Sequence, residues 1–291
     1  MSGKRWVALI AGFMGLVILS ACETPGPTPR PTHTLLPSLV PSPTVNPVIP
    51  TVDSQAAIGV NVPEAAAAPN EGSLEGLVPL PAEEPFEVLA SSDRLRLRGT
   101  LFRAAQEPAP AILLLHMLGG RKEDWLPLVT PLQQAGYTVL AMDLRGHGVT
   151  GGAPDWELAR EDAVDMLAAL RAVEGVDPSR VGAVGASIGA NLSLVGCAAS
   201  PFCRTAILLS PGLDYRGVMT EGAVEQLGER PLLIVASQED VYSAQSSQTL
   251  DGLASGPHEL VLYDGAGHGT AMLGAESSLV EAIRAWLDVH L

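Results

Sequence analysis

The chain has 291 residues, of which 47% are hydrophobic, so it is long enough to bury the core of one large domain. Its formal net charge is −15, which would repel a phosphate backbone, and we therefore expect no nucleic-acid partner. Composition changes along the chain predict three segments, residues 1–21, 22–82 and 83–291.

The first segment combines a basic start, an apolar run and a cysteine. A basic start, "MSGKRW", precedes the apolar run "VALIAGFMGLVILSA", whose length is typical of a signal-peptide core. The run ends in "LSAC", which resembles the lipobox, the motif whose cysteine is lipidated. We predict cleavage after residue 21 and an extracytoplasmic protein held on a bacterial membrane surface by acyl chains on Cys22. An ordinary signal peptide and an uncleaved anchor are the alternatives.

Residues 22–82 are predicted to be a disordered tether that begins with the lipidated cysteine. They are rich in proline, threonine, serine and alanine, as in "TPGPTPRPTHTLLPSLVPSPT". Proline fixes φ and has no backbone N–H to donate, so such a run cannot build a helix or a sheet. We expect an extended segment that carries the following domain away from the membrane.

From residue 83 onward the pattern predicts an α/β fold. Residues 86–104 alternate as an antiparallel hairpin does. Six apolar runs then alternate with helical segments and predict strands at 111–116, 137–143, 180–186, 205–210, 231–237 and 258–264. Unbroken apolar strands suit a sheet that is buried on both faces. The helices include 155–175, with Asp155 as N-cap, and a C-terminal helix whose apolar face carries Leu279, Ile283, Trp286 and Leu287. We therefore predict a doubly wound, mostly parallel sheet.

One serine lies at a predicted strand-to-helix junction, in "GASIG" at 185–189. A sharp turn there forces its central residue into an unfavourable conformation and requires small residues two positions away on either side. Gly185 and Gly189 meet that requirement. Ser187 is thus the candidate nucleophile, with the N–H of Ile188 as one donor to a reaction oxyanion.

A serine nucleophile needs a base, and the base needs a carboxylate. His268 lies in a flexible, glycine-rich loop just after the last predicted strand. Asp240 follows the preceding strand and is the preferred carboxylate over its neighbour Glu239 and the earlier Asp214. The second oxyanion donor is expected in the loop "HMLGG", at Leu118 or else at Met117.

Five ordered motifs are spread over the predicted domain, namely "LLLHMLGG", "DLRGHG", "GASIG", "SQED" and "GAGHG". Together they resemble those of the α/β-hydrolase superfamily, in its serine esterase, dienelactone-hydrolase-like or aminopeptidase-like branch. The resemblance implies an eight-stranded α/β-hydrolase fold and a serine-hydrolase mechanism without cofactor or metal. Many members have glycine where this chain has Met117. In similar proteins the loops of His116 and His147 are mostly structural, and we expect Trp125 and Trp156 to pack rather than to bind a cofactor.

The 211–230 segment bears on the substrate, since it is long enough for a loop and one short helix but not for a cap domain. We therefore predict an open site that cleaves small-molecule carboxylic esters of modest size through an acyl-enzyme. A peptidase or dienelactone-type hydrolase on the same triad, and a non-catalytic binding domain, are the alternatives. Cys197 and Cys203 could form a disulfide outside the cytoplasm or remain buried thiols. The sequence leaves the oligomeric state open.

Overall fold

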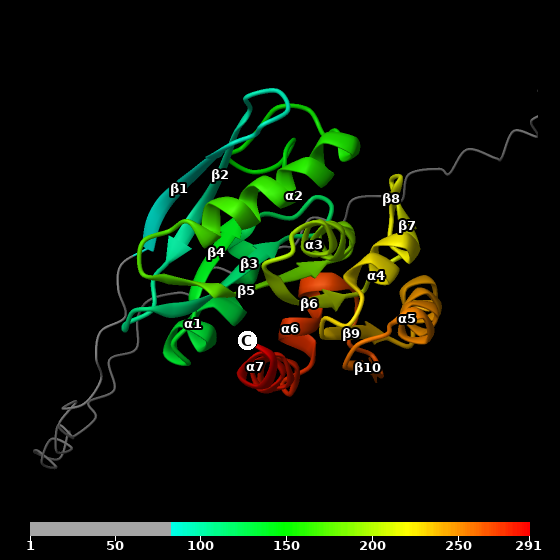
Figure 1. Ribbon diagram of the computed structural model, residues 1–291. Coiled ribbons are helices and arrows are strands. Elements are labelled where there is room, and N and C mark those ends of the chain that lie inside the picture. Colours follow the sequence, from blue (N-terminus) through cyan, green and yellow to red (C-terminus); the bar gives the residue numbers. More distant parts are fainter. Residues whose placement is uncertain (1–82) are drawn as a thin grey trace, which may run out of the picture. The chain divides into compact units, whose positions relative to one another are not determined.

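A computed structural model describes residues 83–291 of the chain (Figure 1). The predicted signal peptide, the lipidation site Cys22 and the proline-rich tether lie outside the described residues. Within residues 83–291, no helix is both long and apolar enough to cross a membrane.

An eight-stranded sheet forms the centre of the domain, in the order β1-β2-β4-β3-β5-β6-β9-β10. Strands β1 and β2 pair antiparallel, as do β2 and β4, whereas all the other neighbours are parallel. The predicted mostly parallel sheet is therefore confirmed. The strands are β1 (Glu83–Leu89), β2 (Arg96–Phe102), β3 (Ala109–Leu115), β4 (Thr138–Met142), β5 (Val176–Ala186), β6 (Cys203–Leu209), β9 (Leu232–Ser237) and β10 (His258–Tyr263).

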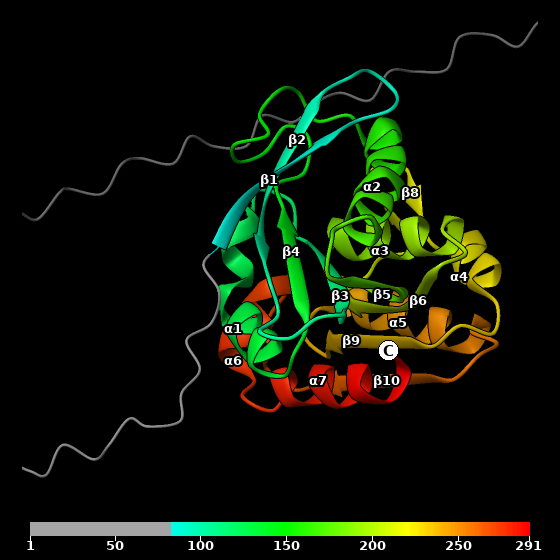
Figure 2. The same ribbon diagram turned by 60° about the vertical axis from the view of Figure 1, so that its left-hand side comes forward.

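Both faces of the sheet are covered, which explains the unbroken apolar strands. Along β3, Leu113 and Leu115 pack into the core on one face, whereas Ile112 and Leu114 pack into the core on the other. Figure 2 shows the helices of the two layers on opposite sides of the sheet. The first layer contains α2 (Trp156–Arg171), α3 (Ile188–Ala199), α4 (Glu221–Leu227) and α5 (Val241–Leu253). The second contains α1 (Leu126–Gln134), α6 (Met272–Ala275) and α7 (Leu279–His290).

Two predicted helices form for the expected reasons. The Asp155 side chain caps α2, since its Oδ1 accepts a hydrogen bond from the Leu158 N–H at 3.0 Å. Helix α7 buries the four residues that the periodicity placed on its apolar face, namely Leu279, Ile283, Trp286 and Leu287.

The segment between β6 and β9 contains more structure than the predicted loop and short helix. It begins with a hairpin of two short strands, β7 (Asp214–Tyr215) and β8 (Val218–Met219), and continues into α4. Two short 3₁₀ helices, η1 (Lys122–Trp125) and η2 (Gly269–Ala271), follow β3 and β10 respectively. The loops after β3, β5, β6, β9 and β10 all leave the carboxyl ends of strands. In a parallel sheet these ends lie at one edge, where ligands of such folds bind.

Candidate active site

Ser187 forms the turn between β5 and α3, in a backbone conformation that residues other than glycine rarely adopt. Its φ and ψ are 54° and −121°. Such a conformation costs about 1–3 kcal/mol and persists only where the surroundings impose it. Here the Ser187 N–H donates to the Leu209 carbonyl of β6 at 2.8 Å, and its carbonyl accepts from the Ala190 N–H at 2.9 Å. The strand and the helix thus hold the turn from both sides.

The two glycines of "GASIG" are required by close contact between backbones. A Cβ atom on Gly185 would lie 2.0 Å from the Gly189 carbonyl oxygen. A Cβ atom on Gly189 would lie 2.2 Å from the Leu115 carbonyl oxygen and 2.5 Å from that of His116. The start of α3 therefore packs directly on the end of β3, and this contact brings Ser187 next to the loop that follows β3.

His268 and Asp240 are in direct contact. The His268 Nδ1 lies 2.5 Å from the Asp240 Oδ2. A carboxylate can only accept, so Nδ1 carries the proton and Nε2 has the free lone pair that a general base needs. Ser187 comes to the same edge of the sheet, but among residues 83–291 its hydroxyl forms no hydrogen bond with His268. Such contacts are often longer in the absence of substrate.

The loop of His268, expected to be flexible, is held at two points by hydrogen bonds. The Gly269 N–H donates to the Ser210 hydroxyl at 2.9 Å, and the Ala266 N–H donates to the Ser237 hydroxyl at 3.0 Å. Glycines 265, 267 and 269 all have positive φ, which lets the loop curl around these contacts. Ser210 and Ser237 were missed by sequence reasoning. Each stands at or just after the end of an apolar strand, and that position was their only signal.

The two carboxylates that were alternatives to Asp240 have other partners. Glu239 accepts from the Ser237 hydroxyl and the Gly265 N–H, each at 2.7 Å, and the hydrogen bond from Ser237 is the main cause that lowers its pKa. Asp214 accepts from the Gly217 N–H at 2.7 Å and so closes the β7–β8 turn. Asp240 alone of the three accepts from His268.

The loop after β3 is fixed by His116, which is fully buried. Its Nε2 accepts from the Leu144 N–H at 3.0 Å, so its Nδ1 carries the proton and donates to the Met117 carbonyl at 2.8 Å. Burial lowers the His116 pKa, which keeps the ring neutral. The Gly120 N–H also donates to the Met117 carbonyl, at 2.9 Å. In a trans peptide the next N–H points the opposite way, so the Leu118 N–H faces away from His116.

Met117 fills space beside the histidine loop. A Cβ atom on Gly269 would lie 2.8 Å from the Met117 sulfur. His147 packs on His116, with their ring centroids 5.2 Å apart, and the centroid of its ring lies 6.0 Å from that of Trp156. These contacts give His147 and Trp156 a packing role, and Trp125 is fully buried in the core.

Tyr215 is a further side chain at this site that sequence reasoning missed. Its ring centroid lies 6.5 Å from that of His268, with the two planes at 86°. Its hydroxyl lies 2.9 Å from the Ser243 hydroxyl in α5. No periodicity marks the segment "GLDYRG" that carries it, because a short hairpin is stabilised by contacts from elsewhere in the fold.

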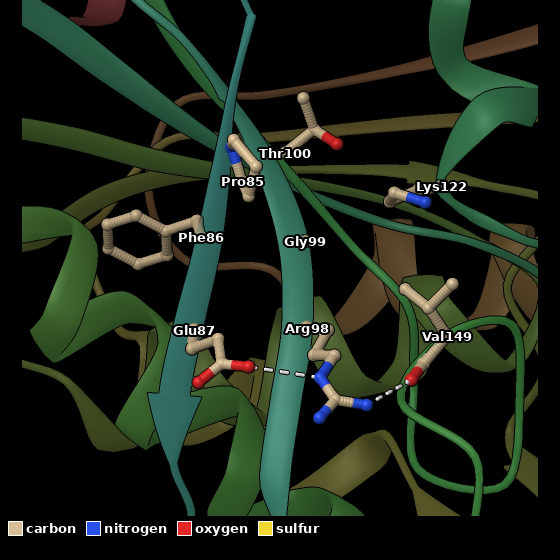
Figure 3. Close-up of a pocket in the computed structure, with 8 residues that line it drawn as sticks. All are labelled: Pro85, Phe86, Glu87, Arg98, Gly99, Thr100, Lys122 and Val149. Atoms are coloured by element: carbon tan, nitrogen blue, oxygen red, sulfur yellow. Dashed lines mark hydrogen bonds and ion pairs between the residues drawn. The ribbon is translucent and has the colours of Figure 1, made fainter.

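A pocket of about 390 Å³ lies elsewhere, over the outer strands β1 and β2 (Figure 3). Three of its lining residues bond to one another, since the Arg98 guanidinium donates to Glu87 and to the Val149 carbonyl, each at 3.0 Å. Neither Ser187 nor His268 lines this pocket, so the candidate active site is an edge of the sheet and not this hollow. Across residues 83–291, no group of three or more histidine, cysteine or acidic side chains is placed to hold a metal ion.

The two cysteines of the domain form a disulfide, Cys197–Cys203, with their Cα atoms 5.1 Å apart. It joins the end of α3 to the start of β6. The Arg230 guanidinium donates to the carbonyls of both cysteines, at 2.7 Å and 3.1 Å. The bond therefore lies on the helix that begins at Ser187, but at its far end.

Comparison with known proteins agrees with this architecture. Residues 110–226 match the family model described as alpha/beta hydrolase fold. The uncharacterized protein Rv2307c of Mycobacterium tuberculosis is 28% identical over 259 residues, which span 82% of this chain and 90% of that protein. A dienelactone hydrolase from Anabaena variabilis superposes with a TM-score of 0.59 at 20% identity, covering 72% of this chain and 99% of the other. The Pyrococcus furiosus esterase Pf2001 does so with a TM-score of 0.61 at 16% identity, covering 72% and 90%.

Proposed function

Because the chain has the α/β-hydrolase fold, we propose that it is a serine hydrolase that cleaves carboxylic esters of modest size. The observation that carries the proposal is the hydrogen bond of 2.5 Å between His268 and Asp240, at the sheet edge where Ser187 forms its strained turn. A histidine oriented by a carboxylate at the same edge of the sheet as a strained serine turn is the arrangement that activates a hydroxyl group.

In the proposed mechanism, Ser187 attacks the ester carbonyl while the Nε2 of His268 takes its proton. Asp240 holds the ring in the required tautomer and stabilises the imidazolium that forms. The N–H groups of Ile188 and Leu118 donate to the oxyanion. Leu118 is preferred over Met117 because two hydrogen bonds on the Met117 carbonyl fix the orientation of the Leu118 N–H.

The second half of the reaction uses the same groups in reverse. The alcohol leaves with the proton that His268 carries, and the acyl group remains on Ser187 as an ester. His268 then takes a proton from a water molecule, which attacks the acyl carbon, and returns that proton to the Ser187 oxygen as the bond to the acyl group breaks and the acid is released. His268 is thus neutral again at the end of the cycle, and the groups used are the three side chains, the two backbone N–H donors and one water molecule.

Support for esters of modest size comes from the segment above the site. Between β6 and β9 the chain forms only a short hairpin and the seven-residue helix α4. The His268 side chain is 41% exposed to solvent. An open edge of this kind offers little apolar surface to a long acyl chain, which would need a deep, enclosed pocket.

The test combines labelling with turnover. A fluorophosphonate probe is expected to label Ser187 in the wild-type protein and to leave Ser187→Ala unlabelled. The same substitution should reduce the hydrolysis of p-nitrophenyl acetate by at least 10³-fold, since the nucleophile is removed. Ser193→Ala is the matched control, because it removes a buried hydroxyl from the same helix α3. Unchanged turnover in Ser187→Ala would refute the mechanism.

The same panel separates the alternatives. Faster cleavage of short peptides or of a dienelactone than of simple esters would replace the substrate class and keep the triad. A correctly folded wild-type protein that the probe does not label would instead favour a binding domain without catalysis.

We also propose that the domain is exported and anchored through lipidated Cys22. Support comes from the lipobox-like "LSAC" after an apolar run, and from the Cys197–Cys203 disulfide, a bond typical of proteins outside the cytoplasm.

A further inference from the structure

Tyr215 lies beside both candidate catalytic side chains, with its ring next to His268 and its hydroxyl near Ser187. Its ring presents an edge to His268, with centroids 6.5 Å apart. Burial raises the pKa of Tyr215 above its ordinary value, and the hydrogen bond with Ser243 and the nearby Ser187 hydroxyl oppose that effect. The phenol therefore keeps its proton at neutral pH and is available as a donor near the Ser187 oxygen.

The strand order places Tyr215 on one particular side of the nucleophile. Strand β5, which ends at Ser187, lies between β3 and β6. The loop with Leu118 follows β3, whereas the hairpin with Tyr215 follows β6. In the proposed mechanism the oxyanion lies on the Leu118 side. The leaving group must lie beside His268, which protonates it, and this is the side on which Tyr215 stands.

The β7–β8 hairpin is held in a fixed position, which a hydrogen-bond donor requires. The amide of Asn191, which is fully buried in α3, donates to the carbonyls of Gly212 and Val218 at 2.9 Å and 2.7 Å. The same amide accepts from the Gly212 N–H at 3.1 Å. The ring of Tyr215 also packs edge-on against that of Tyr242, with centroids 5.5 Å apart.

Ser243 can leave the phenol proton free to point toward the substrate. Its side chain is fully buried, and within the described part of the chain Tyr215 is its only hydrogen-bond partner. When Ser243 donates its proton to the phenol oxygen, the Tyr215 O–H is free to donate elsewhere. A buried hydroxyl with a single partner orients that partner strongly, because breaking the bond leaves it unsatisfied.

We propose that Tyr215 is a further catalytic residue, whose hydroxyl donates a hydrogen bond to the leaving-group oxygen of the substrate. The inference rests on the proposed function. As the bond between the acyl carbon and that oxygen breaks, its electron pair moves onto the oxygen and His268 supplies the proton. Tyr215 keeps its own proton and stabilises the charge that develops before the transfer is complete. The stabilisation by Tyr215 is largest for leaving alcohols that are weak acids, because negative charge on their oxygen is the least stable.

The test compares two esters of one acid in Tyr215→Phe. The kcat/KM for ethyl acetate should fall about 5–10-fold, the effect of one neutral hydrogen bond, whereas that for p-nitrophenyl acetate should fall less than about twofold, since p-nitrophenolate leaves without help. Tyr137→Phe is the matched control. Tyr137 directly precedes β4, away from the site, and the hydroxyl that the substitution removes bonds to Asp288 at 2.8 Å. This variant should leave both rates unchanged.

A second pair of variants tests the geometry. Ser243→Ala should shift the ratio of the two rates in the same direction as Tyr215→Phe, and the double variant should be no slower than Tyr215→Phe alone. An equal loss on both esters would assign Tyr215 a merely structural role, and no loss on either would remove it from the reaction. Either result overturns this inference while fluorophosphonate still labels Ser187. A wild-type protein that is not labelled overturns the proposed function, and this inference with it.

Discussion

Gly189→Ala is expected to damage both the stability of the domain and its activity. The added Cβ would lie 2.2 Å from the Leu115 carbonyl oxygen and 2.5 Å from that of His116. Neither oxygen can move easily, because both belong to backbone at the end of the central strand β3. The start of α3 must therefore shift away from the sheet, and Ser187, at its first turn, must shift with it.

The magnitude follows from the cost of overpacking a well-packed site, which is about 1–3 kcal/mol. A loss of about 2 kcal/mol lowers the melting temperature of a domain of this size by about 4–8 °C. Displacing the nucleophile by even a fraction of an ångström should reduce kcat/KM for p-nitrophenyl acetate about 10–100-fold, well beyond what the stability loss explains at 25 °C.

Gly222→Ala is the control for this experiment. Gly222 lies within helix α4, and no atom lies within 4 Å of the position its Cβ would take. Alanine favours a helix over glycine by up to about 1 kcal/mol, so this variant should melt at the same temperature or higher, with unchanged turnover. Thermal unfolding by circular dichroism and initial rates measure both quantities. Wild-type stability and turnover in Gly189→Ala would refute the close packing of α3 on β3.

Three further predictions concern stability, pH and location. Cys203→Ser opens a disulfide between residues six apart, and urea unfolding should show a loss of about 2 kcal/mol that chemical reduction of the wild-type protein reproduces; equal stability of both forms would contradict it. The buried His116 has a lowered pKa in the folded state, so the unfolded chain binds the proton first and the free energy of unfolding should fall as the pH drops below about 6.5. That fall should be smaller in His116→Asn, and an identical pH dependence would argue against it. Cys22→Ser should move the protein from the membrane to the soluble fraction, whereas continued membrane association would favour an uncleaved anchor.

The strands that the sequence predicted well are those buried on both faces. The run at 111–116 corresponds to β3, Ala109–Leu115, within two residues at each end. Strand β5 begins at Val176, four residues earlier than predicted. The prediction missed this start because it carries the polar residues Asp177 and Ser179, and a register shift separates it from the rest of the strand. Hydrophobic pattern cannot detect a strand whose start is exposed.

Helix α5 is a helix that the hydrophobic pattern could not predict, because its buried face is polar. It buries the serines 243, 246 and 247 where a core-facing helix usually has large apolar side chains. The sequence therefore shows no apolar stripe there, and only the structure reveals that the hydroxyls of Ser246 and Ser243 bond to Leu213 and Tyr215 respectively. Small polar residues allow the helix to lie close to that segment and to bond to it.

Ser187, Asp240 and His268 could be predicted because each follows a recognisable strand, and their order along the chain restricts the choice. What holds them could not be predicted, because the contacts join residues that are distant in sequence. The bond from Gly269 to Ser210 spans 59 positions, and that from Asp240 to His268 spans 28. No local pattern specifies such pairs, since each depends on the register of neighbouring strands.

Helix α3 connects the predictable and the unpredictable parts of the site. Its first turn creates the bend at Ser187, and one turn later the buried amide of Asn191 fixes the hairpin that carries Tyr215. Residues four apart in a helix lie on the same face, so a polar residue at 191 reaches over the same edge of the sheet as Ser187. The asparagine therefore ties the loop after the next strand, β6, to the helix that begins at the nucleophile.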